Sequence, residues 1–311
     1  MIHYPAREPK SLDEVSRAVF ENPRIAVEQA EQSFQEQIRI LSEDAVRRDA
    51  HIVLLTGPSS SGKTTTANRL VDDLSALGRR AVRISLDDFY RNRDEMPLWE
   101  DGRKNFEAVE CLDLDCLHEC TQKLMSTGHV DFPIFDFTSG TRSERVHPVD
   151  YDDNTIIVYE GIHSLHPHLR EGLADCCFGI YIHPNTNFVD EGGNVILDAH
   201  DLRLTRRIIR DSINRGTSPL GTLQMWKDVL RGELLYIRPN SGYADVYVNT
   251  CHDYEPFLYS ASILKMLSEM EDAGDEAETV ERLKQSFQYF FSIGVDLIPP
   301  DSLIQEFIGK N

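Results

Sequence analysis

The residues best suited to do chemistry form one stretch, Gly-Pro-Ser-Ser-Ser-Gly-Lys-Thr, running from Gly57 to Thr64. Its glycines let backbone N–H groups curl around phosphate oxygens, and the helix expected after it adds partial positive charge at its N-terminus. Lys63 is expected to reach the β and γ phosphates, and the Thr64 hydroxyl to face Mg²⁺. The pattern predicts a nucleoside triphosphate site. Its expected phosphate contacts are Gly57, Ser59, Ser60, Ser61, Gly62, Lys63, Thr64 and Thr65.

Acidic residues follow two other short apolar stretches. Asp87 and Asp88 come after residues 81–86, and Glu160 comes after residues 155–159. Parallel sheets bind ligands at the carboxyl ends of their strands, so these acids are expected near the phosphates. One aspartate can take the proton of an attacking hydroxyl, with a helix N-cap as its alternative role. Glu160 is expected to bind Mg²⁺ directly or through water.

A third group consists of arginines. Arg203, Arg206, Arg207 and Arg210 are spaced i, i+3, i+4 and i+7, which places them on one face of a helix, and Arg215 lies one turn further. Guanidinium groups suit the spread charge of a phosphoryl group in transfer, so the stripe predicts a cationic lid. The alternative is salt bridging to an acidic surface, because the chain carries a net charge of −20.

The motifs leave three classes to compare: a small-molecule kinase, a GTPase-type switch, and an ATPase motor or transporter subunit. A GTPase should carry Asn-Lys-x-Asp, and a transporter ATPase should carry Leu-Ser-Gly-Gly; the sequence has neither. A kinase needs a base, a cationic lid and an acceptor site, and the segments above supply candidates. The acidic net charge argues against a nucleic-acid partner.

The elements that must position these residues alternate along the chain. Strands are expected at 51–56, 81–86, 155–159, 178–182 and 245–249, and helices at 64–77, 113–126, 165–173, 201–214, 220–231 and 254–270. This alternation predicts an α/β fold, a doubly wound and mostly parallel sheet with helices on both faces. With the phosphate loop, the expectation is a P-loop NTPase fold.

The flanks predict two additions to this domain. Residues 1–50 should form an N-terminal helical arm, and residues 271–311 an acidic solvated loop followed by an aromatic extension that packs back on the body. The central part, residues 51–270, would be the kinase domain, with an arginine-rich lid over about residues 200–235. The sequence leaves the roles of both flanks open.

The location follows from composition. No run of about 18 apolar residues exists, and the first ten residues lack the apolar core of a signal peptide, so the chain is expected to be cytoplasmic and away from membranes. Six cysteines fit a reducing compartment, and their spacing does not favour zinc. A homo-oligomer stays open.

Taken together, these segments resemble the uridine kinase and phosphoribulokinase family of P-loop kinases over about residues 51–249. The motifs that carry the likeness are Gly57 to Thr64, Asp87 to Tyr90, Asn105-Phe-Glu107, Pro133 to Phe137 with Arg142, Glu160-Gly-Ile162, Arg203 to Gly216, and Tyr243-Ala-Asp245. Residues 222–226, 231–233 and 298–309 resemble a bacterial uridine-kinase-like branch. Its members often carry a threonyl-tRNA-synthetase-like N-terminal region, expected here to be missing or nearly so.

The resemblance implies roles for individual residues. Asp87 would be the general base, with Thr64 and Glu160 flanking Mg²⁺ and Asp87 close by. Lys63, Arg207 and Arg210 would join Asp87 in catalysis, and Arg206 and Arg215 would contact the nucleotide. Glu107 takes the place of an acid that holds ribose hydroxyls. The implied acceptor site comprises Asp87, Tyr90, Glu107, Phe135, Asp136, Arg142 and Arg203.

The acceptor motif departs from the family pattern. Where uridine kinases have a tyrosine and a histidine that read the pyrimidine, this chain has Phe135 and Gly140. A site built on such hydrogen bonds discriminates strongly, so their loss matters. The sequence predicts an ATP-dependent small-molecule kinase with Mg²⁺, and the favoured acceptor is a nucleoside 5′-hydroxyl. The alternatives are a kinase for another sugar or phosphosugar, or a nucleotide-binding regulatory protein without turnover.

Overall fold

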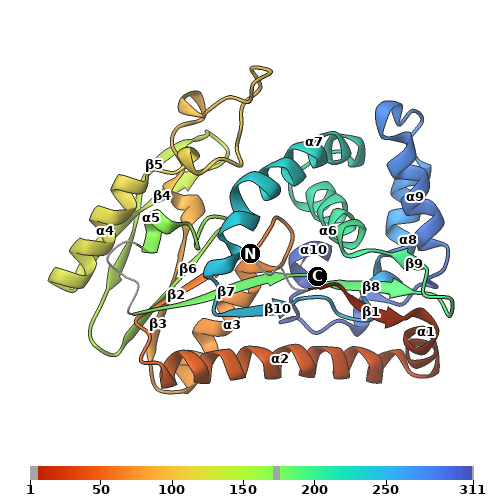
Figure 1. Cartoon of the computed structure of the whole chain (residues 1–311), viewed down its shortest axis with the longest axis horizontal. Helices are drawn as coiled ribbons and strands as arrows, with labels where there is room; N and C mark the ends of the chain where they lie inside the picture. Colours follow the sequence, from red (N-terminus) through yellow and green to blue (C-terminus); the bar gives the residue numbers. More distant parts are fainter. Residues whose placement is uncertain (1–5, 171–175, 310–311) are drawn as a thin grey trace.

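The computed structural model describes residues 6–170 and 176–309 (Figure 1). The strands are β1 Glu8–Ser11, β2 Ile52–Thr56, β3 Arg80–Ser85, β4 His129–Asp136, β5 Thr141–Asp150, β6 Thr155–Glu160, β7 Cys177–His183, β8 Thr186–Val189, β9 Val195–Leu197 and β10 Val246–Asn249. The helices are α1 Leu12–Glu21, α2 Pro23–Arg47, α3 Lys63–Ala76, α4 Leu114–Thr127, α5 Pro167–Arg170, α6 Ala199–Asn214, α7 Pro219–Gly232, α8 Glu255–Ser268, α9 Ala277–Phe287 and α10 Gln305–Ile308.

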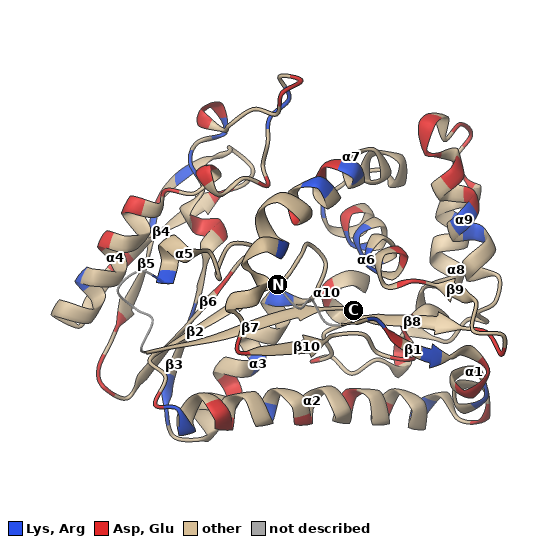
Figure 2. Ribbon diagram, viewed as in Figure 1, with Lys and Arg blue, Asp and Glu red and all other residues tan. Residues whose placement is uncertain are grey.

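A five-stranded parallel sheet forms the centre, in the order β10-β7-β2-β6-β3. Every residue of β2, the middle strand, is buried. Neither β2 nor β7 carries a charged residue, whereas charged residues gather on the surrounding helices and loops (Figure 2). Because the strands are parallel, their carboxyl ends meet at one edge of the sheet, where the loops after β2, β3 and β6 come together.

Alternate residues of each strand enter two separate apolar cores. From β2, Val53 and Leu55 pack with buried residues of α2, α3, α6 and α8, whereas Ile52 and Leu54 pack with those of α4 and of the hairpin β4–β5. A strand buried on both faces reads as a continuous apolar run, which is the pattern that predicted it. The predicted α/β fold, with a parallel sheet covered on both faces, is confirmed.

The two flanks pack into the first of these cores. Phe34 of α2, Phe287 of α9 and Phe307 of α10 all belong to the same buried cluster as the sheet residues. Helix α2 runs beneath the sheet along the length of the molecule (Figure 1). Strand β1 extends the arm as a parallel partner of β8. The arm and the extension therefore share one core with the domain between them, while the predicted domain boundaries stay a prediction.

The structure corrects three local predictions. The helix expected at 165–173 is only α5, Pro167–Arg170, within the described residues, and residues 171–175 lie outside them. The hairpin β4–β5 and the small sheet β1-β8-β9 were not anticipated. The acidic stretch is not wholly solvated, because Glu276 is buried and accepts a hydrogen bond of 2.9 Å from Lys227.

Among residues 6–170 and 176–309, every helix is too short or too polar to cross a lipid bilayer.

Candidate active site

The phosphate loop connects β2 to α3 and needs its glycines for geometric reasons. Gly62 has φ +91°, a left-handed conformation that favours glycine. A Cβ on Gly57 would lie 2.2 Å from the carbonyl oxygen of Ile182, so no side chain fits there. Ser60 also has a positive φ, of 61°, in the curled part of the loop. The sequence thus produces the tight loop that the motif predicted.

The interior of this loop offers polar atoms without protein partners. The hydroxyl oxygens of Ser60 and Ser61 are buried and accept or donate no hydrogen bond within the described part of the chain. Buried polar atoms normally have a partner, so their isolation calls for an explanation. Helix α3 begins here with N–H groups that have no intrahelical acceptor. Loop hydroxyls and helix N–H groups together fit the oxygens of a polyphosphate.

Three charged groups meet beside the loop. Lys63 Nζ donates to the carbonyl of Pro58 at 3.2 Å. Burial lowers the pKa of Lys63, and the Glu160 and Asp87 carboxylates oppose that change. Glu160 is 4% exposed at the end of β6; burial raises the pKa of its carboxyl, and the neighbouring Asp87 adds to the rise. Arg83 donates to Glu160 at 3.5 Å. The strand ends therefore bring a lysine and two carboxylates together, as predicted.

The two adjacent aspartates have different surroundings. Asp88 Oδ1 accepts a hydrogen bond of 3.1 Å from the backbone N–H of Phe135, which attaches β4 to the end of β3. Asp87 keeps contact with solvent; desolvation by the surrounding protein raises the pKa of its carboxyl, and Lys63 opposes that rise. Asp88 therefore has a structural partner, and Asp87 is the aspartate available to an acceptor hydroxyl.

Arg206 is not a nucleotide ligand, which corrects the predicted assignment. Its side chain is fully buried, and its Nε and Nη2 donate to the two carboxylate oxygens of Glu255 at 2.7 and 2.5 Å. Nη2 also donates to the carbonyl of Thr250 at 2.7 Å, and Nη1 to the carbonyl of Ser60 at 3.3 Å. All three nitrogens of this buried guanidinium donate to protein groups. Through its hydrogen bond to the Ser60 carbonyl, Arg206 supports the phosphate loop and does not contact the nucleotide.

The other arginines of α6 have different partners. Arg203 is buried against Glu233 at 2.5 Å, and Arg210 pairs with Asp211 at 2.8 Å. Arg207 Nη1 donates to the hydroxyl of Ser59 at 2.7 Å, so this arginine contacts the loop directly. The stripe faces the protein interior because most of α6 is buried, which a helical spacing alone does not reveal. Ion pairing also involves Arg206 with Glu255 and Arg207 with Asp211, but these acidic partners are buried and do not form the acidic surface of the alternative interpretation.

Arg215 stands at the carboxyl end of α6. Its side chain is 57% exposed, and its Nε lies 3.5 Å from Asp211. Desolvation lowers the pKa of Arg215, and the nearby Asp211, Asp87 and Glu306 carboxylates oppose the change. Arg207, Arg210 and Arg215 thus share Asp211 as a partner; Arg207 contacts the phosphate loop, and Arg215 is the most exposed of the three.

On the acceptor side, Glu107 is fixed by its neighbours. Its backbone N–H donates to Asn105 Oδ1 at 3.0 Å, and Asn105 Nδ2 donates to the hydroxyl of Tyr236 at 3.0 Å. A Cβ on Gly232 would lie 2.2 Å from Glu107 Cβ, so the end of α7 admits only glycine here. Burial raises the pKa of Glu107 to about 7, while Arg207 and Lys63 oppose the rise. Glu107 therefore lies near Lys63 of the phosphate loop and near Arg207 of α6.

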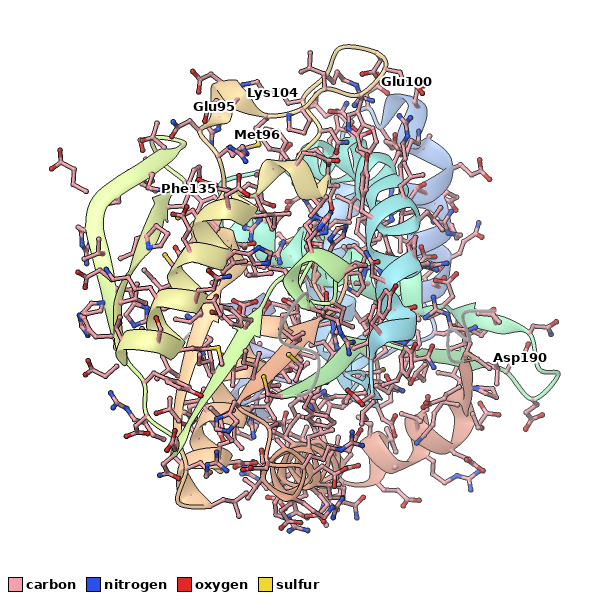
Figure 3. The ribbon with its side chains drawn as sticks, turned by 60° about the vertical axis from the view of Figure 1, so that its left-hand side comes forward. Glu95, Met96, Glu100, Lys104, Phe135 and Asp190 are labelled. Carbon is pink, nitrogen blue, oxygen red and sulfur yellow. The ribbon has the colours of Figure 1, made fainter. Side chains whose placement is uncertain are left out.

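Aromatic rings form the wall next to Asp87. The Phe135 ring centroid lies 6.0 Å from that of Tyr90 and 5.0 Å from that of Phe137. The Tyr90 hydroxyl donates to the carbonyl of Phe106 at 3.3 Å. In Figure 3, the loop that carries Met96 rises above Phe135, and Asp190 lies on the opposite side of the molecule. The wall is apolar where a pyrimidine reader would be polar.

Two predicted acceptor residues have other partners. The Asp136 carboxylate accepts from the backbone N–H of Thr138 at 2.8 Å and closes the β4–β5 turn. Arg142 donates to Asp113 at 3.2 Å, at the start of α4. Asp136 and Arg142 are thus held at the hairpin, whereas Asp87 and Glu107 both lie near Tyr90, whose ring contacts that of Phe135.

Sequence reasoning missed three residues at this site. Glu255 holds Arg206, and Glu306 accepts a hydrogen bond of 3.1 Å from Thr65 Oγ1. His163 is buried, and desolvation lowers its pKa to about 3, so its ring is neutral at pH 7. No local pattern marks any of the three. The closest hint in the sequence was that His163 directly follows the Glu160-Gly-Ile162 motif.

Known proteins are similar in sequence to the region that contains most of these residues. The profile of the Phosphoribulokinase / Uridine kinase family matches residues 52–255. A uridine kinase of Bacillus pumilus is 29% identical over 198 residues, which are 63% of this chain and 85% of that relative. A uridine kinase of Bacillus thuringiensis is 31% identical over 199 residues, or 63% and 84%. The uridine kinase-like protein 4 of Arabidopsis thaliana is 32% identical over 212 residues, or 67% and 40%.

Among solved structures, the phosphoribulokinase from Rhodobacter spheroides is 22% identical to this chain. The superposition covers 67% of this chain and 74% of that enzyme, with a TM-score of 0.43. An overlap this loose says nothing about the acceptor. The predicted likeness to the branch with a synthetase-like N-terminal region stays a prediction.

Proposed function

This chain belongs to the phosphoribulokinase and uridine kinase family, and from that membership we propose that it transfers the γ-phosphoryl group of ATP to a hydroxyl of a small molecule. One observation carries the proposal. Lys63, Asp87 and Glu160 meet at the carboxyl edge of the sheet, next to a phosphate loop in which the hydroxyls of Ser60 and Ser61 have no partner among the described residues. Such a lysine and two carboxylates are what phosphoryl transfer needs around a polyphosphate.

The residues fit both ATP and Mg²⁺. The loop hydroxyls and the N–H groups at the start of α3 would hold the phosphates, with Lys63 and Arg207 supplying positive charge. The Thr64 hydroxyl, which is exposed, and the carboxylates of Glu160 and Asp87 form an oxygen donor set of the kind that Mg²⁺ prefers. Mg²⁺, when bound, neutralises charge on phosphate oxygens.

Asp87 and Glu107 have different roles toward the acceptor. Asp87 orients the attacking hydroxyl and takes its proton, because the adjacent Asp88 already accepts a hydrogen bond from the Phe135 backbone N–H. The raised pKa of Asp87 suits a base better than an unperturbed aspartate would. Glu107 binds neighbouring hydroxyls of the acceptor, and the lid arginines Arg207 and Arg215 neutralise charge on the phosphoryl group in transfer.

A nucleoside, through its 5′-hydroxyl, is the first acceptor to test, because the matched relatives are named uridine kinases. A sugar or phosphosugar is the second, and a specific observation favours it. The wall contains Phe135 in place of a phenol, and Gly140, with φ +72°, packs against Arg93 instead of presenting an imidazole. These groups cannot form hydrogen bonds to a pyrimidine ring.

The test is ADP release from MgATP across a panel of nucleosides, sugars and phosphosugars. One acceptor class should raise ADP production far above the rate without acceptor, and Lys63→Ala should abolish that increase. If no acceptor raises ADP production while ATP still binds, the chain is a regulatory nucleotide-binding protein. Turnover that survives Lys63→Ala would overturn the assignment of the phosphate loop.

A further inference from the structure

The short C-terminal helix α10 contacts the phosphate loop. Glu306 Oε2 accepts hydrogen bonds from the hydroxyl of Thr65 at 3.1 Å and from its backbone N–H at 3.4 Å. Thr65 lies in the first turn of α3, directly after the motif that ends at Thr64. Its N–H is one of those that the helix leaves without an intrahelical acceptor. The carboxylate of Glu306, near the C-terminus, thus accepts hydrogen bonds from two donors of Thr65, directly after the phosphate loop.

The residues around Glu306 are packed against the same loop. Leu303 is fully buried, and a Cβ on Gly62 would lie 2.5 Å from Leu303 Cδ1. The ring of Phe307, also fully buried, lies 4.8 Å from the guanidinium of Arg206, which itself holds the loop. Glu306 therefore extends from a segment whose apolar residues cover the outside of the phosphate loop.

The N-terminal arm fixes the backbone of this segment. Ser302 Oγ donates to the buried carboxylate of Glu31 on α2 at 2.5 Å, and the hydroxyl of Tyr254 donates to the same carboxylate at 2.6 Å. Ile304 is fully buried. Because the main chain is held on both sides of Leu303, the part able to leave the loop is the Glu306 side chain, which is partly exposed.

The charge of Glu306 acts on the phosphate site. It lies close enough to oppose the lowering of the pKa of Lys63 and of Arg215, two of the cations near the phosphate loop. N–H groups and hydroxyls at the start of a helix after such a loop bind phosphate oxygens. A carboxylate and a phosphate cannot share the donors of Thr65, because both are anionic acceptors.

We propose that Glu306 is an internal competitor of the nucleotide: its carboxylate occupies the donors of Thr65, and ATP binds when the side chain turns away. This inference rests on the proposed function in naming ATP as the ligand. Removing the side chain should tighten MgATP binding by about tenfold, the equivalent of one or two hydrogen bonds that the nucleotide no longer has to displace, and removing the charge alone should tighten it by less because a glutamine can still accept from Thr65.

The experiment is calorimetric titration of the full chain with MgATP. The variants are Glu306→Gln, which keeps the volume and removes the charge, and Glu306→Ala, which removes the contact. The matched control is Glu278→Gln, an exposed glutamate on α9 in the same C-terminal part of the chain. Thermal melts of all four proteins verify that each is folded.

Tighter binding by both Glu306 variants, with the control unchanged, is the expected result. Equal affinity in all four proteins would refute the inference alone. Weaker binding by Glu306→Gln would also refute it, because Glu306 would then help to hold the nucleotide. If no protein of the set binds MgATP, the proposed function fails and the inference fails with it.

Discussion

The buried ion pair between Arg206 and Glu255 allows the sharpest test of how this fold supports its phosphate loop. Both side chains are completely buried, and two hydrogen bonds of 2.7 and 2.5 Å join them. Arg206→Met removes the cation and leaves the Glu255 carboxylate buried without its partner. Removing one member of a buried pair costs about 3–5 kcal/mol of unfolding free energy, which corresponds to a melting temperature lower by roughly 10 °C.

The assay is urea unfolding monitored by circular dichroism, together with the KM for MgATP. We expect the KM to rise as well, because Arg206 Nη1 holds the carbonyl of Ser60, whose φ is positive. The control is Arg39→Met, which disrupts an exposed pair with Glu36 on α2 and should leave stability unchanged.

A second variant separates the orphaned charge from lost packing. Arg206→Met combined with Glu255→Gln removes both charges of this pair, and the glutamine can still accept from the backbone N–H of His252, as Glu255 does at 2.7 Å. We expect the double variant to recover much of the lost stability. If Arg206→Met costs no more than Arg39→Met, the reasoning about the buried pair is refuted. If the double variant is as unstable as the single one, packing and not charge explains the loss.

Two further predictions concern the carboxylates of the site. Asp87→Asn should lower kcat by at least about 10² with ATP binding kept, whereas Asp88→Ala, which removes the acceptor of the Phe135 N–H, should mainly reduce stability; equal kcat losses in the two variants would contradict the division of roles. The pKa of Glu107 is about 7 in the folded chain against an ordinary value of 4.5, so the folded state binds its proton more tightly. Stability should therefore fall as pH rises from about 4.5 to about 7, and Glu107→Gln should flatten that part of the profile; parallel profiles in urea unfolding would count against it.

Local pattern was sufficient for the sheet and the phosphate loop. The apolar run of β2 followed by a glycine-rich turn predicts a buried parallel strand and a phosphate loop, and both lie where expected. The resemblance to the phosphoribulokinase and uridine kinase family is confirmed by the match over residues 52–255. These features are encoded within a few neighbouring residues, so a single segment carries the whole signal.

Local pattern failed where a residue's role depends on a distant partner. Helical spacing placed Arg206 in a phosphate-facing stripe, whereas its partner Glu255 lies 49 residues further on and draws it into the core. The hairpin β4–β5 was missed as well, because its second strand, from Thr141 to Asp150, is largely exposed and lacks an apolar face.

The sequence by itself determined that a phosphate loop follows a buried strand, that acids follow two further strands, and that the chain resembles P-loop kinases. Only the tertiary structure decided which of those groups are available. It placed the Asp88 carboxylate against the backbone N–H of Phe135 and Asp87 near Lys63, and it brought Glu306 to Thr65 across 241 residues of chain. The physical reason is that hydrogen bonds and ion pairs between distant segments form only when the packed cores bring those segments together, so no local pattern records them.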